Sequence, residues 1–253
     1  MKKLRRVTEA EVISKFLRNE FYQEEFHHDR EQFEHLVLDA DLSDDNANAL
    51  RRALLFRRRG HMWREIPLDT AWWEVEIEAE DLDRVRVFPR AQWRKVANGS
   101  FLLKDIAARI RHQRFYGKTR DFVTRVQALS YKLRESDDQS AVLLIGVDDS
   151  QPVTILEGNH RLTAALLAAP GILRCRFRVF CGFSPNMSES CWYQTNVSNL
   201  WRYAKNRARN LFYDRDADVE RVMNPPDETD NASDRVVASA PSVAASNTVA
   251  NSK

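Results

Sequence analysis

The chain has few cysteines. Cys175, Cys181 and Cys191 are the three in 253 residues, and they form neither a CxxC pair nor an even set. This spacing excludes a disulfide framework and argues against a metal site built from thiolates. Sparse cysteine of this kind is typical of proteins from a reducing compartment. We therefore expect a cytoplasmic protein.

The chain also lacks a long apolar run. No segment approaches the roughly 20 apolar residues that a membrane-spanning helix needs. The first six residues are basic, but the amphipathic stretch that follows contains acidic residues, unlike the apolar core of a secretory signal. We expect no membrane partner.

Several familiar catalytic motifs are missing as well. The sequence contains no glycine-rich P-loop, no HExxH pair and no nucleophile elbow, and this removes the enzyme classes that depend on them. Apolar residues make up 43% of the chain, with six Trp and thirteen Phe. This is enough for one core with additions or for two small domains.

Charge is unevenly distributed along the chain. The formal net charge is +2, but residues 214–253 carry eight acidic and four basic side chains, so residues 1–213 carry +6. This mild excess favours an anionic ligand, although it is far below the charge density of a dedicated duplex-DNA binder.

Apolar periodicity and capping residues predict an α/β (α+β) protein with three regions. Residues 1–65 form an N-terminal helical subdomain, residues 66–213 a small mixed sheet with flanking helices and a terminal helix, and residues 214–253 a disordered tail of acidic and small residues. Helices are predicted at 9–22, 26–37, 43–60, 91–97, 100–110, 119–133, 161–169 and 192–212, and strands at 72–81, 84–88, 141–147, 153–156 and 174–180.

Residues 154–166 are the most informative segment. A β-branched apolar run ends in Glu157 and Gly158, and a polar Asn159-His160-Arg161 sequence then opens an Ala/Leu-rich helix. The N-terminus of a helix offers unpaired N–H groups and a positive dipole end to an anion, and the arginine adds a charged fork that matches phosphate. The alternative is a purely structural turn with the arginine in a salt bridge.

This Glu-Gly-Asn-His-Arg turn resembles the signature of the ParB/sulfiredoxin superfamily, and the resemblance extends over about residues 72–181. It implies a small mixed sheet of the ParB/sulfiredoxin type in which Gly158, Asn159, His160 and Arg161 hold nucleotide phosphates. Asn159 stands where sulfiredoxins have their reactive cysteine, so their thiol chemistry is not expected. Glu157 occupies the position of an acid that helps phosphoryl transfer in the free-serine kinase branch.

The resemblance leads to a first functional hypothesis. The protein binds ATP, ADP or CTP with Mg²⁺ and either hydrolyses the nucleotide or transfers its phosphoryl group to a small hydroxylated acceptor. Glu157 and His160 are the candidate catalytic residues, and Glu157 is also the candidate Mg²⁺ ligand. Arg90 and Trp93 are candidate contacts to the base or the acceptor, with core packing as the alternative for the tryptophan.

Two other hypotheses remain open. In the second, the same turn grips a backbone phosphate of a nucleic acid, in a binding or nuclease module, and the basic segments 51–59 and 202–209 extend the footprint. The alternative for segment 51–59 is a solvated helix face, and for segment 202–209 a helix with one buried and one solvated face. In the third hypothesis, the fold retains the turn as a non-catalytic interaction protein.

Overall fold

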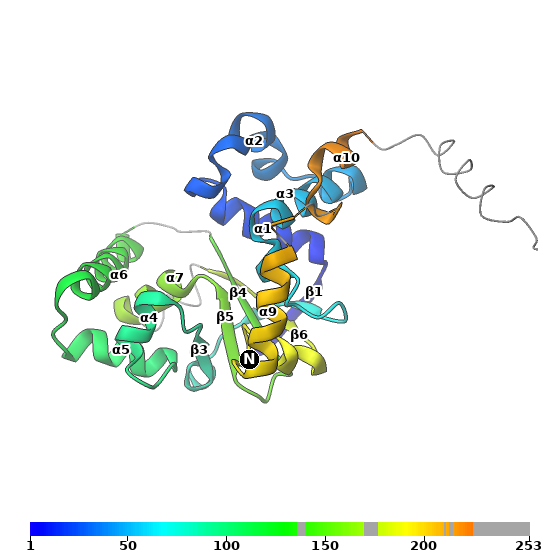
Figure 1. The fold of residues 1–253 in the computed structure, drawn as a ribbon. Helices are drawn as coiled ribbons and strands as arrows, with labels where there is room; N and C mark the ends of the chain where they lie inside the picture. The colour runs from blue at the N-terminus through cyan, green and yellow to red at the C-terminus, as the bar shows by residue number, and fades with distance from the viewer. Residues whose placement is uncertain (136–139, 170–176, 210, 213–214, 225–253) are drawn as a thin grey trace, which may run out of the picture.

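The computed structural model describes residues 1–224, apart from 136–139, 170–176, 210 and 213–214 (Figure 1). The described elements are β1 (Lys2–Val7), α1 (Glu9–Glu20), η1 (Glu24–Asp29), α2 (Arg30–Leu38), α3 (Asp45–Trp63), β2 (Ala71–Glu76), η2 (Glu80–Asp83), β3 (Val85–Val87), α4 (Ala91–Ala97), α5 (Leu103–His112), α6 (Gly117–Glu135), β4 (Ala141–Gly146), β5 (Val153–Glu157), α7 (Asn159–Ala168), β6 (Arg178–Phe183), η3 (Pro185–Glu189), α9 (Val197–Arg209), η4 (Arg215–Ala217) and α10 (Val219–Met223).

The strands form one mixed six-stranded sheet in the order β1-β2-β6-β4-β5-β3. The pairs β1–β2, β2–β6 and β4–β5 are antiparallel, whereas β4–β6 and β3–β5 are parallel. The predicted α/β fold class is confirmed, and β4 and β5 form the hairpin that the turn-rich segment between them indicates. Strand β5 pairs with β3 as far as Ile155 and with β4 as far as Glu157.

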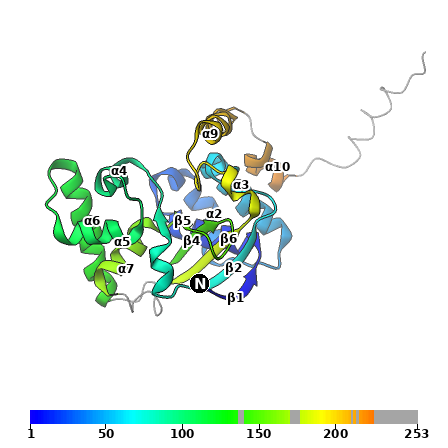
Figure 2. The same cartoon turned by 90° about the horizontal axis from the view of Figure 1, so that it is seen from below.

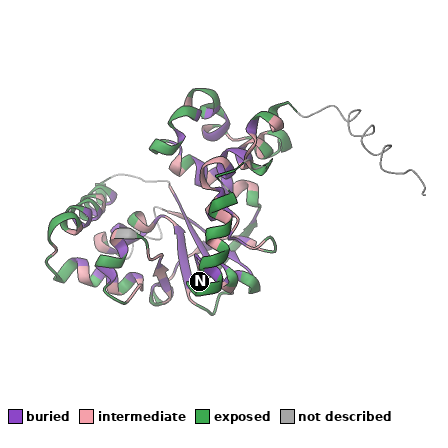
Figure 3. Cartoon of the chain, viewed as in Figure 1, coloured by how far each residue is buried: buried purple, intermediate pink, exposed green. Residues whose placement is uncertain are grey.

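Helices cover both faces of the sheet, and each face has its own apolar cluster. Along β4, Val142 and Leu144 pack with α4 to α7, while the alternating residues Leu143 and Ile145 pack with the N-terminal helices. All six residues of β4 are buried, in keeping with its continuous apolar sequence (Figure 3). Figure 2 shows α4 to α7 gathered at one end of the molecule, with α3, α9 and α10 at the other.

The N-terminal residues contribute a strand as well as helices. Helix α1 begins at Glu9, after the N-cap Thr8, whose side chain accepts a hydrogen bond from the Glu11 N–H at 3.1 Å. The reciprocal half of the predicted capping box is not formed, because the Glu11 carboxylate accepts from Arg5 instead. The preceding strand β1 was not predicted, because its sequence is mostly charged and its side chains are exposed at the sheet edge. Helices α1 to α3 share one apolar cluster with the sheet.

The arginines of α3 stabilise the N-terminal helices. Arg51 is 1% exposed, and its guanidinium donates to the carbonyls of Leu36 and Asp41 and to the Asn48 side chain. Its neighbours form ion pairs with acids of α1 and of the η1 segment, namely Arg52 with Glu9, Arg57 and Arg58 with Asp29, and Arg59 with Glu20 and Glu25. The segment is therefore a network of internal contacts rather than an open basic face.

The C-terminal expectations differ from the structure in their bounds. The terminal helix predicted at 192–212 is shorter and spans Val197–Arg209. Within the predicted tail, η4 and α10 are folded and pack on α3, whereas residues 225–253 lie outside the described residues. The strand predicted at 174–180 appears as β6 at Arg178–Phe183, and residues 174–176 lie outside the described residues.

Candidate functional site

The strand, tight turn and helix predicted around Gly158 are present. Strand β5 ends at Glu157, Gly158 adopts a φ of 101°, and α7 begins at Asn159. A Cβ atom on Gly158 would lie 2.9 Å from Val142 Cγ2 of the neighbouring strand. Two features therefore favour glycine at this position, namely the left-handed backbone conformation and the close packing on β4.

The first turn of α7 presents polar groups without a side-chain cap. Among the described residues, no side chain caps this N-terminus, and the buried Oδ1 atom of Asn159 has no hydrogen-bond partner. The Asn159 carbonyl does have one, because the Thr163 hydroxyl donates to it at 2.7 Å. Helix N-termini without caps are favourable places for anions.

Arg161, on α7, lines a cavity of about 340 Å³. The other side chains that define the cavity's charge are Lys15 and Arg18 from α1 and Arg178 from β6, together with the neutral Asn19. No acidic residue of the described chain lines it. Arg178 nevertheless has acidic partners nearby, since it contacts Glu74 at 2.8 Å. Four basic groups from three elements thus converge on one hollow.

The surroundings of Lys15 reflect this positive charge. Burial lowers the pKa of its ammonium group, and the charges of Arg178 and Arg18 lower it further, against the raising effects of Glu11 and Glu74. Both lowering effects disfavour the charged form of lysine. An anion bound in the cavity would reverse the second effect, so the cavity is electrostatically suited to a negatively charged ligand. We refer to it below as the basic cavity.

Glu157 lies next to Arg161 and has an unusual pKa. Burial and the nearby charge of Glu20 raise the pKa of this carboxyl to about 7, against the lowering effects of Arg161, the Gly158 N–H and Arg90. The Arg161 Nη1 atom is 3.8 Å from the carboxylate. A carboxyl that titrates near neutrality can take up and release a proton at physiological pH, which is the property of a general base.

His160 has different surroundings from Arg161. Its ring packs against Trp93 and Phe122, with 5.2 Å between ring centroids in both cases, and it is not among the residues that line the basic cavity. Burial lowers the pKa of His160, and so do the charges of Arg125 and Arg161. Trp93 is only 4% exposed, so its packing matches the core alternative rather than a contact to a base.

Sequence reasoning found one member of the basic cavity and missed the others. Lys15 and Arg18 are three residues apart on α1, and Arg178 is the first residue of β6. All three are far in sequence from the turn around Gly158. Spacing of three on a helix places two side chains on one face, but nothing local indicates what that face meets. Glu20, which raises the pKa of Glu157, was missed for the same reason.

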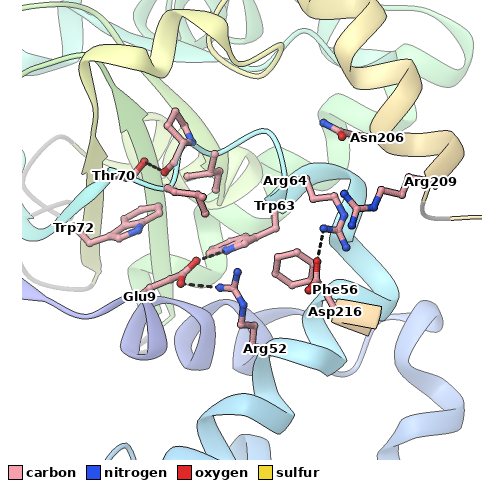
Figure 4. Close-up of a pocket in the computed structure, with 13 residues that line it drawn as sticks. Glu9, Arg52, Phe56, Trp63, Arg64, Thr70, Trp72, Asn206, Arg209 and Asp216 are labelled. Atoms are coloured by element: carbon pink, nitrogen blue, oxygen red, sulfur yellow. Dashed lines mark hydrogen bonds and ion pairs between the residues drawn. The ribbon is translucent and has the colours of Figure 1, made fainter. Parts of the chain in front are cut away.

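A different cavity, of about 380 Å³, lies between α3, β2 and α9 (Figure 4). Both acids of its lining are paired with residues of α3 or the end of that helix: Glu9 accepts from Arg52 at 2.7 Å and from Trp63 at 3.0 Å, and Asp216 accepts from Arg64 at 2.8 Å. These pairs attach α1 and η4 to α3. The cavity is accordingly a less suitable place for a charged ligand than the basic cavity.

Comparison with known proteins gives no match. No protein-family model matches this chain, and neither a curated protein nor a solved structure shows a significant similarity to it. Within the described residues, no group of three or more His, Cys, Asp or Glu side chains is placed to hold a metal ion, and no helix is long and apolar enough to cross a membrane.

Proposed function

We propose that this protein binds a nucleoside polyphosphate in the basic cavity and that Glu157 accepts a proton when the phosphoryl group is hydrolysed or transferred. One observation carries the proposal: four basic side chains converge on a cavity that shares Arg161 with a carboxyl whose pKa is about 7. The resemblance of the turn to the ParB/sulfiredoxin signature supports the same function.

Binding follows from the charges of the cavity. Phosphate oxygens interact strongly with guanidinium and ammonium groups, because both partners are ionised and the hydrogen bonds are charge-assisted. Arg161 supplies a planar fork, whereas Lys15 supplies a point charge. The uncapped N-terminus of α7 contributes a favourable dipole close to Arg161.

The chemical step needs a base close to the phosphates. Glu157 takes the proton of an attacking water or acceptor hydroxyl. The oxygen of that water or hydroxyl forms a bond to the terminal phosphorus, and the bond from that phosphorus to the bridging oxygen breaks. The nucleoside diphosphate leaves with the electron pair of that bond. We assign this proton to Glu157 rather than to His160, since His160 packs against Trp93 and Phe122.

The donor chemistry is compatible with Mg²⁺ that arrives bound to the nucleotide. This ion is commonly held by one or two carboxylates, by substrate phosphates and by water. Bound Mg²⁺ would neutralise charge on the phosphates. Glu157, beside Arg161, is the residue that would hold it.

Calorimetric titration of the full chain with ATP, ADP and CTP in the presence of Mg²⁺ tests the proposal. Arg161→Ala should weaken binding about 10- to 100-fold, the effect of losing a hydrogen bond to a charged group. Arg120→Ala is the matched control, because Arg120 is an exposed arginine of α6 that pairs with its neighbour Asp121. Unchanged affinity in Arg161→Ala, or no binding to the wild type, would overturn the proposal.

Helix α9 supports nucleic-acid binding as a second candidate. It carries Arg202, Lys205, Arg207 and Arg209 without an acidic residue, and the side chain of Trp201 is 76% exposed. Exposed aromatic groups among basic ones are typical of single-strand binders. A titration with a short single-stranded DNA distinguishes the candidates. An affinity for this DNA that falls steeply with added salt and is unchanged in Arg161→Ala favours nucleic-acid binding.

A further inference from the structure

Besides the basic cavity and the cavity of Figure 4, a further cavity of about 480 Å³ lies between α3, the loop from β3 to α4, and α9. As the second candidate binding site, it is called the second cavity below. Its volume is within the usual range for small-molecule sites. Basic and aromatic side chains form most of its lining, among them Arg59, His61, Phe88, Arg90, Trp192 and Tyr203. It is distinct from the basic cavity, with which it shares no lining residue.

The lining of the second cavity is positive at neutral pH. Arg59, Arg90 and Arg94 contribute three charges, and the acid of the lining, Glu25, accepts a hydrogen bond from Arg59 at 2.9 Å. Burial and the charges of Arg59, Arg90 and Arg207 lower the pKa of His61 to about 4, so its imidazole is neutral at pH 7. An anion is the ligand that this lining favours.

The guanidinium of Arg90 has hydrogen-bond donors available for a ligand. Within the described chain its guanidinium makes one hydrogen bond, to Met62 Sδ at 3.6 Å, and thioether sulfur is a weak acceptor. It lies 4.5 Å above the ring of Trp192, whose buried Nε1 has no hydrogen-bond partner among the described residues. An arginine fork held against an aromatic ring is well placed to meet a carboxylate through two parallel hydrogen bonds.

The remaining walls favour a ring rather than an aliphatic chain. Trp192 contacts Phe88 and Tyr203 with ring centroids 4.4 and 5.6 Å apart, and Tyr203 meets His61 at 6.0 Å. Aromatic groups prefer edge-to-face and offset contacts with other rings, so a planar ring system gains contacts here that a flexible chain does not.

The geometry points to a binding site for a small aromatic carboxylic acid, whose carboxylate meets Arg90 and whose ring packs among Trp192 and Tyr203. This inference does not rest on nucleotide binding in the basic cavity.

Calorimetric titration with 2-naphthoate tests the inference. We expect saturable binding to the full chain and at least tenfold weaker binding of 2-naphthamide, which has the same ring without the charge. Arg90→Gln should weaken 2-naphthoate binding by a similar factor, whereas Arg120→Gln on α6 should leave it unchanged. Equal affinity for the acid and the amide, or no binding of the acid to the wild type, would overturn the inference.

Two further measurements make the outcome unambiguous. The comparison of naphthoate with naphthamide uses the wild type alone, so it holds even where Arg90→Gln fails to fold. Arg161→Ala should bind 2-naphthoate as the wild type does, because Arg161 does not line this cavity. Loss of naphthoate binding in Arg161→Ala would contradict two separate sites, whatever the result with nucleotides.

Discussion

Replacing Glu157 with glutamine is expected to stabilise the protein at pH 8. The folded protein holds the pKa of this carboxyl at about 7, whereas the unfolded chain has the ordinary value of 4.5. Between these values the folded state binds more protons than the unfolded state, so the free energy of unfolding falls as the pH rises from about 4.5 to 7. Glutamine does not titrate, and it therefore removes this loss.

The expected gain is large at pH 8 and small at pH 5. The difference between the two pKa values corresponds to about 3 kcal/mol at most at pH 8. For a chain of this size, that stabilisation would raise the midpoint of thermal unfolding by roughly 5–10 °C. Thermal unfolding of the wild type and Glu157→Gln at both pH values measures the effect. A variant that is less stable than the wild type at pH 8 would contradict a carboxyl held near neutrality.

Glu74→Gln is the control with the opposite sign. The hydrogen bond from Arg178 lowers the pKa of Glu74, so its ionised form stabilises the folded protein above the ordinary pKa of the carboxyl. Its replacement should reduce stability at pH 8, where Glu157→Gln increases it.

In the proposed reaction, Glu157→Gln should also lower turnover about 10²- to 10⁴-fold, the usual contribution of a general base.

Gly158→Ala is expected to destabilise the protein by about 3 kcal/mol. One contribution is backbone strain, since a φ of 101° costs an L-residue roughly 1–2 kcal/mol. The other is overlap with Val142 Cγ2, which would lie 2.9 Å from the new Cβ in a strand that is buried on both faces. Overpacking of a tight core costs about 1–3 kcal/mol. Urea unfolding of both proteins measures the sum.

Gly99→Ala separates the two contributions. Gly99 has almost the same φ, 103°, but nothing lies within 4 Å of the place where its Cβ would stand. This variant should therefore show the backbone strain alone, about 1–2 kcal/mol. A double-mutant cycle with Val142→Ala should recover part of the loss in Gly158→Ala, because it removes the overlapping methyl groups. Equal losses in the two glycine variants would contradict close packing at Gly158.

The parts of the fold that local sequence determines were predictable. Thr8 is the N-cap of α1, and the β-branched run before Gly158 gives the strand and turn of the candidate site. In both cases the residues that decide the structure lie within a few positions of one another. Periodicity and capping report such short-range preferences well.

The parts that depend on distant partners were not predictable. Strand β1 exists because its backbone pairs with β2, about 70 residues away, although its charged sequence gives little sign of a strand. Arg51 is as basic as its neighbours, yet it is buried because the carbonyls of Leu36 and Asp41, which precede the helix, and the side chain of Asn48 accept its hydrogen bonds. The basic cavity likewise depends on α1 and β6 meeting beside α7.

The central claim is that phosphate binds beside Arg161, and a crystal structure of the protein with Mg²⁺ and pyrophosphate tests it most directly. We expect pyrophosphate in the basic cavity, with its oxygens contacting Arg161 and at least one of Lys15, Arg18 and Arg178. Pyrophosphate bound at another place on the protein, with the basic cavity empty at saturating concentration, would contradict the claim.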